Sequence, residues 1–432
     1  MKFQAVKGMR DMYPDAMRVR TWLLDVWRRV SLRHGFEEYD APILENLELF
    51  TVKSGDEIAN QLFHLTDRGG RRLAVRPEIT PPLARMVAAK LNSLPRPIKW
   101  FSLPRLCRAE NPQRGRLREF FQWNVDVIGE ASELADAECV FVLVDFLREV
   151  GFAPGEIMVR YSSRSLLAAV LGALGVDDEQ QPAVLAALDK RAKLPADAFE
   201  KMLAEALPNA DARAAVGRFL DMGDVSAVAP DALAERLGAD LPEAAAEALA
   251  SLGRFREHLE RFGIAAWCAY DPNIVRGLAY YTGIVYEAIA AGERAVAGGG
   301  RYDNLLELVG AGGEAPATGF GMGDVVLGLL LEETGKLPER AGRLDYFVID
   351  AAAGTFPTVL QVVADLRRAG RSADYSYARR AVGKQLKEAN RRGARTAVLV
   401  GDGAAGVKDL ATGRQEDMSL DTFVAGAAAP EA

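Results

Sequence analysis

The sequence has few cysteines and histidines, which limits the metal and redox chemistry open to the chain. Among 432 residues there are three cysteines, Cys107, Cys139 and Cys268, and none of them belongs to a CxxC pair. A disulfide framework and a structural zinc site are therefore not expected. The three histidines are equally scattered. We expect them to pack or lie at the surface, and we expect no zinc.

Long hydrophobic runs are also missing. The longest apolar stretches, such as 325–331, fall far short of the ~20 residues that span a bilayer. The first residues carry charge with no apolar run behind them, so we expect neither a membrane segment nor a signal peptide. The predicted compartment is the cytoplasm. Hydrophobic residues make up 49% and charged residues 26%, which is typical of globular chains and excludes disorder.

The P-loop and serine-hydrolase motifs are absent from the sequence. It has no GxxxxGK[ST], so an ordinary P-loop site is not expected. A Gly-x-Ser-x-Gly element is missing as well, which argues against serine hydrolysis.

Charge is distributed unevenly along the chain. The net charge is −7, but residues 365–395 hold ten basic residues against three acidic ones, a local charge of +7. The rest of the chain then carries −14. A basic patch on an acidic body indicates contact with a polyanion. A solvated helical face is the alternative, and charge alone leaves both open.

The pattern of apolar residues predicts mixed helices and strands in the first half of the chain. Between Pro14 and Gly35, apolar residues recur three and four apart, which predicts a helix. Alternating segments on either side of the charged turn 111–118 predict antiparallel strands, followed by a helix at 131–150. Residues 161–250 contain 25 alanines, which favours a helical insertion.

The C-terminal part reads as a separate domain. Residues 334–343 have the polar, Gly- and Pro-containing composition of a linker. Beyond them, strands are predicted at 346–349, 373–377 and 396–400, alternating with helices at 358–368 and 380–392. Such alternation predicts a parallel or mixed α/β domain of about 90 residues.

An arginine-rich turn is the strongest local signal for chemistry. It holds Arg108, Arg114, Arg116 and Arg118, whose guanidiniums suit phosphate oxygens. Its neighbour Glu110 can hold an arginine or accept from a base amino group. An exposed charged turn is the simpler alternative.

Three further segments also carry signals for chemistry, the first of them a polar pair on a face where a core is expected. Gln122 and Asp126 lie four apart, on the same face of a predicted strand as Asn124. Arg276 precedes a strand with two tyrosines. The glycines at 298–300 allow close approach of a ligand to the backbone.

Taken in order along the chain, these motifs resemble the class II aminoacyl-tRNA synthetases, specifically the histidyl-tRNA synthetase family. The resemblance is carried by Arg76-Pro-Glu, Arg108-Ala-Glu with the arginine-rich turn, Arg276-Gly-Leu-Ala-Tyr-Tyr and Gly298-Gly-Gly-Arg-Tyr-Asp. The opening Lys7-Gly-Met-Arg-Asp and residues 65–71 also fit. The segment 384–395 resembles the family's anticodon-binding domain.

The resemblance implies an α+β fold. It implies a catalytic domain over 1–333, with a class II antiparallel sheet flanked by helices and a helical insertion at about 165–262. An α/β anticodon-binding domain would cover 345–432. It also implies a homodimer that joins L-histidine to tRNA(His), with ATP giving AMP and pyrophosphate.

The resemblance also implies the roles of individual residues. Arg108 and Arg276 would be catalytic, gripping the α-phosphate of ATP. The histidine-binding residues would be Glu78, Thr80, Gln122, Asp126, Tyr280 and Tyr281. The ATP-binding residues would be Arg108, Glu110, Arg116, Arg118 and Arg276, with Mg²⁺ entering together with ATP. The tRNA-binding residues would be Arg391, Arg392 and Arg395.

Two positions depart from the family pattern. Ala279 stands where the family usually has Asp, and Val326 stands where the third class II motif supplies an arginine for the γ-phosphate. We expect Arg116 and Arg118, two apart and on one side if they lie on a strand, to take over that charge. Two alternatives stay open: a non-catalytic regulatory subunit of ATP phosphoribosyltransferase, and a tRNA-sensing module.

Overall fold

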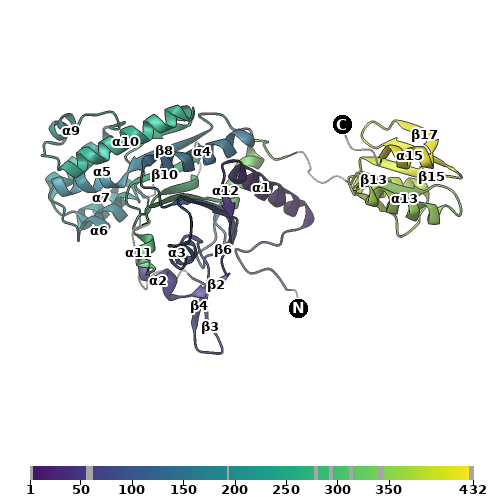
Figure 1. Cartoon of the computed structure of the whole chain (residues 1–432), viewed down its shortest axis with the longest axis horizontal. Helices are drawn as coiled ribbons and strands as arrows, with labels where there is room; N and C mark the ends of the chain where they lie inside the picture. The colour runs from purple at the N-terminus through teal and green to yellow at the C-terminus, as the bar shows by residue number, and fades with distance from the viewer. Residues whose placement is uncertain are drawn as a thin grey trace. The chain divides into compact units, whose positions relative to one another are not determined.

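The chain forms two units, Met1–Leu337 and Pro338–Ala432, each with its own hydrophobic cores. The computed structural model describes residues 3–54, 62–191, 194–276, 281–290, 295–310, 315–338 and 344–427. Figure 1 labels the elements of both units along the chain.

The larger unit alternates between short strands and helices before its helical part. The elements up to residue 163 are α1 (Pro14–Arg33), β1 (Glu37–Glu38), β2 (Leu44–Asn46), α2 (Glu48–Ser54), β3 (His64–Thr66), β4 (Arg72–Val75), α3 (Thr80–Ala88), β5 (Ile98–Ser102), β6 (Arg105–Cys107), β7 (Glu119–Ile128), α4 (Glu133–Glu149) and β8 (Ile157–Ser163). The later elements are α5 (Arg164–Ala173), α6 (Gln181–Leu188), α7 (Ala196–Ala206), α8 (Ala210–Asp221), α9 (Pro230–Leu237), α10 (Glu243–Arg261), η2 (Ala265–Trp267), β9 (Cys268–Tyr270), β10 (Ile284–Ala290), β11 (Ala295–Arg301), α11 (Leu305–Leu308), β12 (Ala317–Gly323) and α12 (Asp324–Glu333).

A nine-stranded sheet forms the centre of this unit. Its order is β1-β5-β7-β12-β11-β10-β8-β9, and β6 pairs with β7 outside that path. All its pairs are antiparallel except β1–β5 and β8–β9 at the two edges. The predicted antiparallel sheet is confirmed for the central strands, and its edges are parallel.

The helix predicted between Pro14 and Gly35 is confirmed as α1. Its apolar stripe, which includes Val26 and Trp27, is buried against the sheet, where Trp27 stacks on Trp123 with ring centroids 5.9 Å apart. Gly35 ends the helix with φ +75°, a left-handed conformation that glycine adopts without a Cβ penalty.

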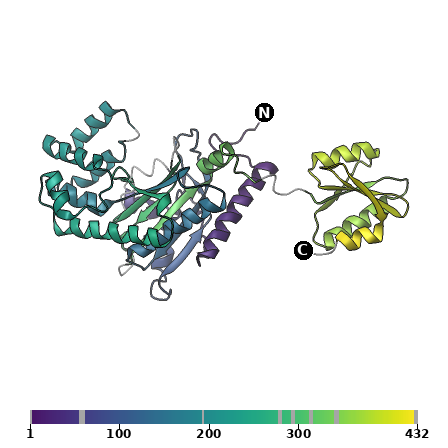
Figure 2. The same ribbon diagram turned by 90° about the horizontal axis from the view of Figure 1, so that it is seen from above.

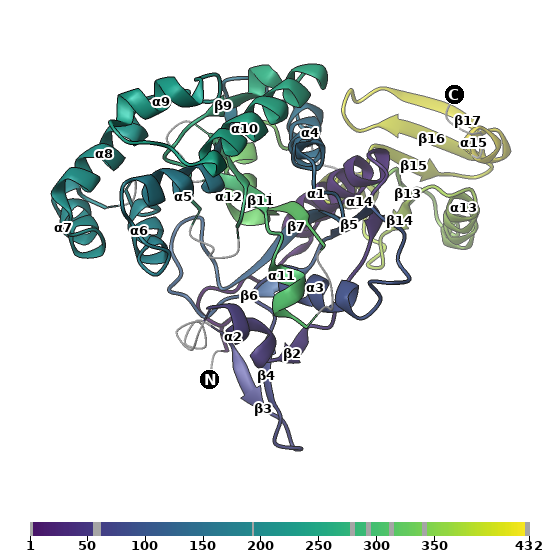
Figure 3. The same cartoon turned by 60° about the vertical axis from the view of Figure 1, so that its left-hand side comes forward.

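Helices α5 to α10 form the alanine-rich part of the unit and lie together beside the central sheet (Figure 3). Their small and leucine side chains build a continuous core with α4 and the sheet, because alanine lets helices approach closely. A separate three-stranded sheet, β2-β4-β3, extends from the other part of the unit, as Figure 3 also shows.

The C-terminal unit is a mixed five-stranded sheet between two layers of helices (Figure 2). Its elements are β13 (Tyr346–Asp350), α13 (Phe356–Arg368), β14 (Ala373–Tyr375), α14 (Val382–Arg391), β15 (Thr396–Val400), β16 (Ala404–Asp409), β17 (Gln415–Ser419) and α15 (Leu420–Ala427). Strands β14-β13-β15 are parallel and β15-β16-β17 antiparallel. Every predicted element is present, and β16, β17 and α15 are additional.

Candidate active site

Two cavities lie on one face of the central sheet and share several residues. The first is about 330 Å³ and the second about 310 Å³. The residues that line both are Arg108, Gln122, Arg276, Gly298 and Gly321. Two compartments that meet at two arginines can hold two substrates with an anionic group at the junction.

Strand β7 supplies the polar floor of the first cavity. Gln122, Asn124 and Asp126 alternate along it and all line the cavity, while Trp123 and Val125 are buried on the opposite face. The predicted placement of Gln122 and Asp126 on one face with Asn124 is confirmed. Side chains of a strand alternate between its two faces, so polar residues at every second position form a row on one face.

Glycines of the neighbouring strands make room for these side chains. A Cβ on Gly319 would lie 2.2 Å from Asp126 Oδ1, and one on Gly321 would lie 2.6 Å from Gln122 Nε2. The glycine run was expected to admit a ligand to the backbone. At Gly298 the space is instead taken by a side chain, since a Cβ there would lie 2.3 Å from Arg276 Nη1.

Asp126 is buried, and only one of its two carboxylate oxygens has a hydrogen-bond partner among the described residues. Tyr302 OH donates to its Oδ1 at 2.5 Å, while Oδ2 has no hydrogen-bond partner among the described residues. Burial raises the pKa of Asp126 to about 7, and the bond from Tyr302 opposes that rise. A ligand that brings an N–H donor into the cavity would satisfy the second oxygen.

Arg108 is a half-buried cation that lines both cavities. Its Nε donates to Pro77 O at 3.1 Å, and its guanidinium lies over the Phe120 ring, 5.1 Å from the centroid. Burial lowers its pKa from the ordinary value, although Glu78 and Glu110 oppose this. No carboxylate of a described residue forms an ion pair with Arg108 at 4.0 Å or less. A half-buried positive charge without a carboxylate partner favours an anionic ligand.

Arg276 lines the same junction of the two cavities. Its Nη1 lies 2.5 Å from Glu287 Oε1 on β10, and its Nε is buried without a hydrogen-bond partner among the described residues. Burial opposes its charge, but Tyr281 and Glu287 outweigh that effect and raise the pKa of Arg276. Its φ of +57° is unusual for a residue with a Cβ and marks a strained position at a binding site.

Glu78 and Thr80 lie where the chain enters α3. Both line the first cavity, and Thr80 is the first residue of the helix. Arg76, four residues before the first residue of α3, is buried and donates to Asp40 Oδ1 and Ala41 O, each at 2.5 Å. Arg76 therefore holds the segment in place and does not line either cavity.

The arginine-rich turn lies before β7 and not on the strand. Arg116 lines the second cavity, with its Nη1 2.7 Å from Glu110 Oε2. Arg118 lines neither cavity; its Nε donates to Glu110 O at 3.0 Å. The side chain of Arg116 therefore lines the second cavity and that of Arg118 does not. This differs from the expectation that both face the same side of a strand. Arg114 pairs with Glu333.

Val326 lines the second cavity beside this turn. A Cβ on Gly115 would lie 3.3 Å from Val326 Cγ2, so the valine packs closely against the turn. The cations that line this cavity in the described part of the chain are Arg108, Arg116 and Arg276.

The three predicted tRNA-binding arginines lie in the C-terminal unit and differ in their contacts. Arg392 pairs with Asp374 and, at 3.3 Å, with Glu388. Arg395 lies 3.3 Å from Asp345. Arg391 is exposed and forms no ion pair with another described residue.

The described residues contain neither a cluster of metal ligands nor a helix that could span a membrane. No group of three His, Cys, Asp or Glu side chains there is placed to hold a metal ion. None of the helices in the same ranges has the length and apolar character needed to cross a bilayer.

Comparison with known proteins decides the family. The family model for histidyl-tRNA synthetase matches residues 8–323, and the anticodon binding domain model matches residues 346–428. The chain belongs to the histidyl-tRNA synthetase family. It is therefore an enzyme of the aminoacyl-tRNA synthetase class, and the predicted recognition and α+β fold are confirmed.

Individual relatives cover nearly the whole chain. A histidine–tRNA ligase of Opitutus terrae is 40% identical over 96% of both chains. A chloroplastic/mitochondrial histidine–tRNA ligase of Arabidopsis thaliana is 38% identical over 96% of this chain and 84% of its own. The crystal structure of histidyl-tRNA synthetase from Nostoc sp. PCC 7120 has the same fold, with a TM-score of 0.82 over 99% of each chain at 24% identity.

The cavities add residues to those predicted and leave one prediction outside the described residues. Asn124 and Tyr302 line the first cavity and had no assigned role. Tyr302 lies two residues after the glycine run, and nothing in the sequence indicates its contact with Asp126. Tyr281 lines the cavity, whereas Tyr280 lies outside the described residues, as does Ala279.

Proposed function

We propose that the first cavity binds histidine, that the second binds ATP, and that the chain forms histidyl-adenylate and then histidyl-tRNA. The observation that carries this proposal is the meeting of both cavities at Arg108 and Arg276. The α-phosphate of ATP and the carboxylate of histidine react with each other, so they need one shared cationic junction.

Recognition of histidine falls to the walls of the first cavity. Glu78 and Thr80 would receive the α-ammonium group, with Gln122 beside them. Asp126 would accept from one imidazole nitrogen through its unpartnered Oδ2. Tyr281 would donate to the other nitrogen, which matches the donor and acceptor of a neutral imidazole. Tyr280 stays a prediction in this role.

Activation of histidine falls to the two arginines. Arg108 and Arg276 would bind the α-phosphate from opposite sides and hold it for in-line attack by the histidine carboxylate. Charge develops on the phosphate oxygens as pyrophosphate leaves, and fixed guanidiniums stabilise it. Glu287 would keep Arg276 oriented through its 2.5 Å ion pair.

Binding of the rest of ATP falls to the arginine-rich turn. Glu110 lines the first cavity and pairs with Arg116 of the second, so it would accept from the adenine amino group where the two cavities meet. Arg116 would supply charge toward the γ-phosphate in place of the missing arginine at Val326. Arg118 would support the turn through its bond to Glu110 O. Mg²⁺ would enter as the MgATP complex, held by the phosphates of the substrate.

Binding of tRNA falls to the C-terminal unit. Arg391 belongs to an exposed row on α14 with Lys384 and Lys387, spaced three and four residues apart. We assign the phosphate contacts chiefly to this row. Arg392 and Arg395 would contribute less, because each already pairs with a carboxylate.

A homodimer fits the exposed apolar side chains of the larger unit. Phe3 and Tyr13 are 91% and 73% exposed, and Ile43, just before β2, is 61% exposed. Covering such side chains by a second copy would remove apolar area from water. Light scattering tests this, since the dimer has twice the 46.8 kDa mass of the chain.

Exchange of labelled pyrophosphate into ATP tests the proposed activity. The account expects exchange that depends on histidine and that no other amino acid supports. Absence of exchange would favour the regulatory subunit or the tRNA-sensing module instead. The regulatory alternative is already less favoured, because the chain carries the matched anticodon binding domain at residues 346–428.

A further inference from the structure

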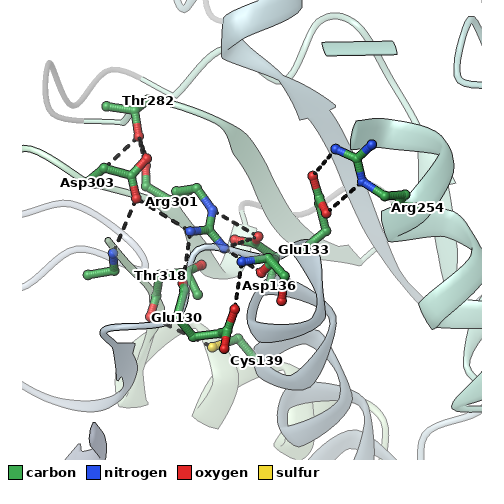
Figure 4. Close-up of polar contacts among 11 residues, drawn as sticks. Glu130, Glu133, Asp136, Cys139, Arg254, Thr282, Arg301, Asp303 and Thr318 are labelled. Carbon is green, nitrogen blue, oxygen red and sulfur yellow. Dashed lines mark hydrogen bonds and ion pairs between the residues drawn. The ribbon is translucent and has the colours of Figure 1, made fainter. Parts of the chain in front are cut away.

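Three consecutive residues follow the glycine run: Arg301 contacts α4, Tyr302 contacts Asp126 of the first cavity, and Asp303 contacts Thr282. Figure 4 shows Arg301 and Asp303 within one network of polar contacts that joins α4, β11 and the segment before β10. None of the three was assigned a role by the sequence motifs. Together they are called the 301–303 segment below.

Arg301 fixes the segment to α4 and the turn before it. Its Nε and Nη2 donate to Asp136 Oδ2 at 3.0 and 2.6 Å, and Asp136 is fully buried. The same guanidinium donates to Glu130 O at 3.1 Å and to Ser132 O at 2.8 Å (Figure 4). A buried guanidinium with this many partners has one orientation available, so the backbone at 301 is held rigidly.

Asp303 fixes Thr282, the residue that follows Tyr281. Its Oδ2 accepts from Thr282 Oγ1 at 2.7 Å, and Thr282 N donates to Arg301 O at 2.9 Å. Asp303 Oδ1 also lies 3.4 Å from Arg301 Nη1. Thr282 is the neighbour of Tyr281, which lines the cavity. The position of Tyr281 is thereby tied to the segment.

Tyr302 lies between these two anchors and reaches the carboxylate on β7. Its N–H donates to Ala317 O at 2.7 Å, and its OH donates to Asp126 Oδ1 at 2.5 Å. The ring is buried. With Oδ1 engaged in this way, Asp126 has one oxygen left, Oδ2, for a ligand in the cavity.

We propose that Tyr302 is a positioning residue for histidine recognition: it orients Asp126 so that Oδ2 faces the imidazole, and Arg301 and Asp303 hold it there. The proposal rests on the proposed function, because it assumes that Asp126 receives the imidazole N–H. It assigns the 301–303 segment the task of setting Asp126 and Tyr281 on either side of one ring.

The role predicts a change in pH dependence that a merely structural tyrosine would not cause. The bond from Tyr302 favours the charged carboxylate, whose pKa burial has already raised to about 7. Removing the hydroxyl should raise that pKa further, so histidine binding should require a higher pH. The other titratable groups that face Asp126 are Tyr39, Tyr281, Tyr286 and Cys139. Burial raises the pKa of each of them, so Asp126 is the group among them that changes charge between pH 6 and 9.

The test compares the full-length wild type with Tyr302→Phe in histidine-dependent pyrophosphate exchange from pH 6 to 9. The variant should raise KM for histidine about tenfold, as loss of a charge-assisted hydrogen bond does, and leave KM for ATP within about twofold. The acid limb of kcat/KM for histidine should move up by about half a pH unit or more. Titration of the substrate imidazole is common to both proteins and cancels in the comparison.

Tyr286→Phe is the matched control, because the hydroxyl of Tyr286 is buried without a hydrogen-bond partner among the described residues. It should leave the histidine KM and the acid limb at their wild-type values. If Tyr302→Phe behaves like this control, the proposal is wrong while the proposed function stands. If the wild type itself shows neither exchange nor histidine binding by calorimetry, the proposed function fails first.

Asp303→Asn provides a second variant that keeps Tyr302 and its hydroxyl. Asp303 is about one-third exposed, so the fold tolerates the change. The variant weakens the hold on Thr282 and should raise KM for histidine severalfold without moving the acid limb. An unchanged KM would remove Asp303 from the positioning segment, and a moved acid limb would contradict the assignment of the pH effect to Tyr302.

Discussion

Asp126 combines complete burial with a carboxylate oxygen that has no partner among the described residues. Its folded-state pKa of about 7 lies above the ordinary value of 3.8. Ionising it in the folded chain therefore costs free energy, a cost that grows as the pH rises from about 4 to 7 and reaches at most ~4 kcal/mol. A buried carboxylate with a raised pKa and an unpartnered oxygen is typical of ligand-binding sites.

The first prediction follows from this balance. Asp126→Asn keeps the shape but removes the anionic acceptor, so KM for histidine should rise by about thirtyfold or more, corresponding to ~2–4 kcal/mol. The same change removes the cost of the buried charge. Its melting temperature relative to the wild type should therefore increase between about pH 4 and 7, as thermal unfolding would measure. Unchanged exchange with histidine would contradict the assignment.

The second prediction separates the two arginines of the turn. Arg116 lines the second cavity and Arg118 does not. Arg116→Ala should raise KM for ATP about tenfold, given ~1.5–3 kcal/mol for a charge-assisted hydrogen bond, and leave KM for histidine nearly unchanged. Arg118→Ala is the matched control and should affect ATP less. A larger effect of Arg118→Ala than of Arg116→Ala on the KM for ATP would indicate that Arg118, and not Arg116, binds the γ-phosphate.

Much of the site could be predicted because its residues belong to motifs that follow one another along the chain in a recognisable order. Arg108, Gln122, Asp126 and Arg276 could be named from motifs, and all four line the cavities. Tyr302 could not, because its contact with Asp126 joins positions 176 residues apart. The packing of Arg276 against Gly298 could not be predicted either. A sequence shows that Gly298 lacks a side chain, but not which residue occupies the space.

Helix α14 places its charge on the exposed face while Gln385 and Ala389 are buried beneath. The third prediction concerns this row. Lys387→Ala/Arg391→Ala should weaken tRNA binding. It should also reduce the magnitude of the slope of log affinity against log salt by about one to two, because fewer phosphate contacts form and fewer counterions are released on binding. Filter binding at several salt concentrations measures both.

Arg414→Ala is the control for this double variant, since Arg414 is exposed but pairs with Glu416 at 2.7 Å. Its tRNA affinity and salt slope should match the wild type. Equal binding by the double variant, the control and the wild type would indicate that the +7 region is only a solvated face.

Elements were predictable where burial imposes a period. Helix α1 has a continuous apolar stripe, and α13 buries Val359, Val362, Val363 and Leu366 at helical spacing. Strand β17 was missed because its residues, Gln415–Ser419, are almost all exposed and polar. Its pairing with β16 is made by the backbone, and no side-chain alternation records it.

At the scale of the whole molecule, the two units have separate hydrophobic cores. The fourth prediction uses this separation. A protein ending at Leu337 should fold, because its core is complete without the C-terminal unit, and it should exchange pyrophosphate at close to the full-length rate. Charging of tRNA should fall at least about tenfold, because the phosphate contacts of α14 are lost. Equal charging by both proteins would contradict the assignment of tRNA to the C-terminal unit.

We propose that one chain activates histidine in the paired cavities and passes it to tRNA. Aminoacylation of tRNA(His) by the full-length protein, with labelled histidine and MgATP, tests it most directly. The account predicts histidyl-tRNA that accumulates only when histidine, ATP and this tRNA are all present, and that is lost in Arg108→Ala. Binding of tRNA without any charged product would contradict the account and support a tRNA-sensing module.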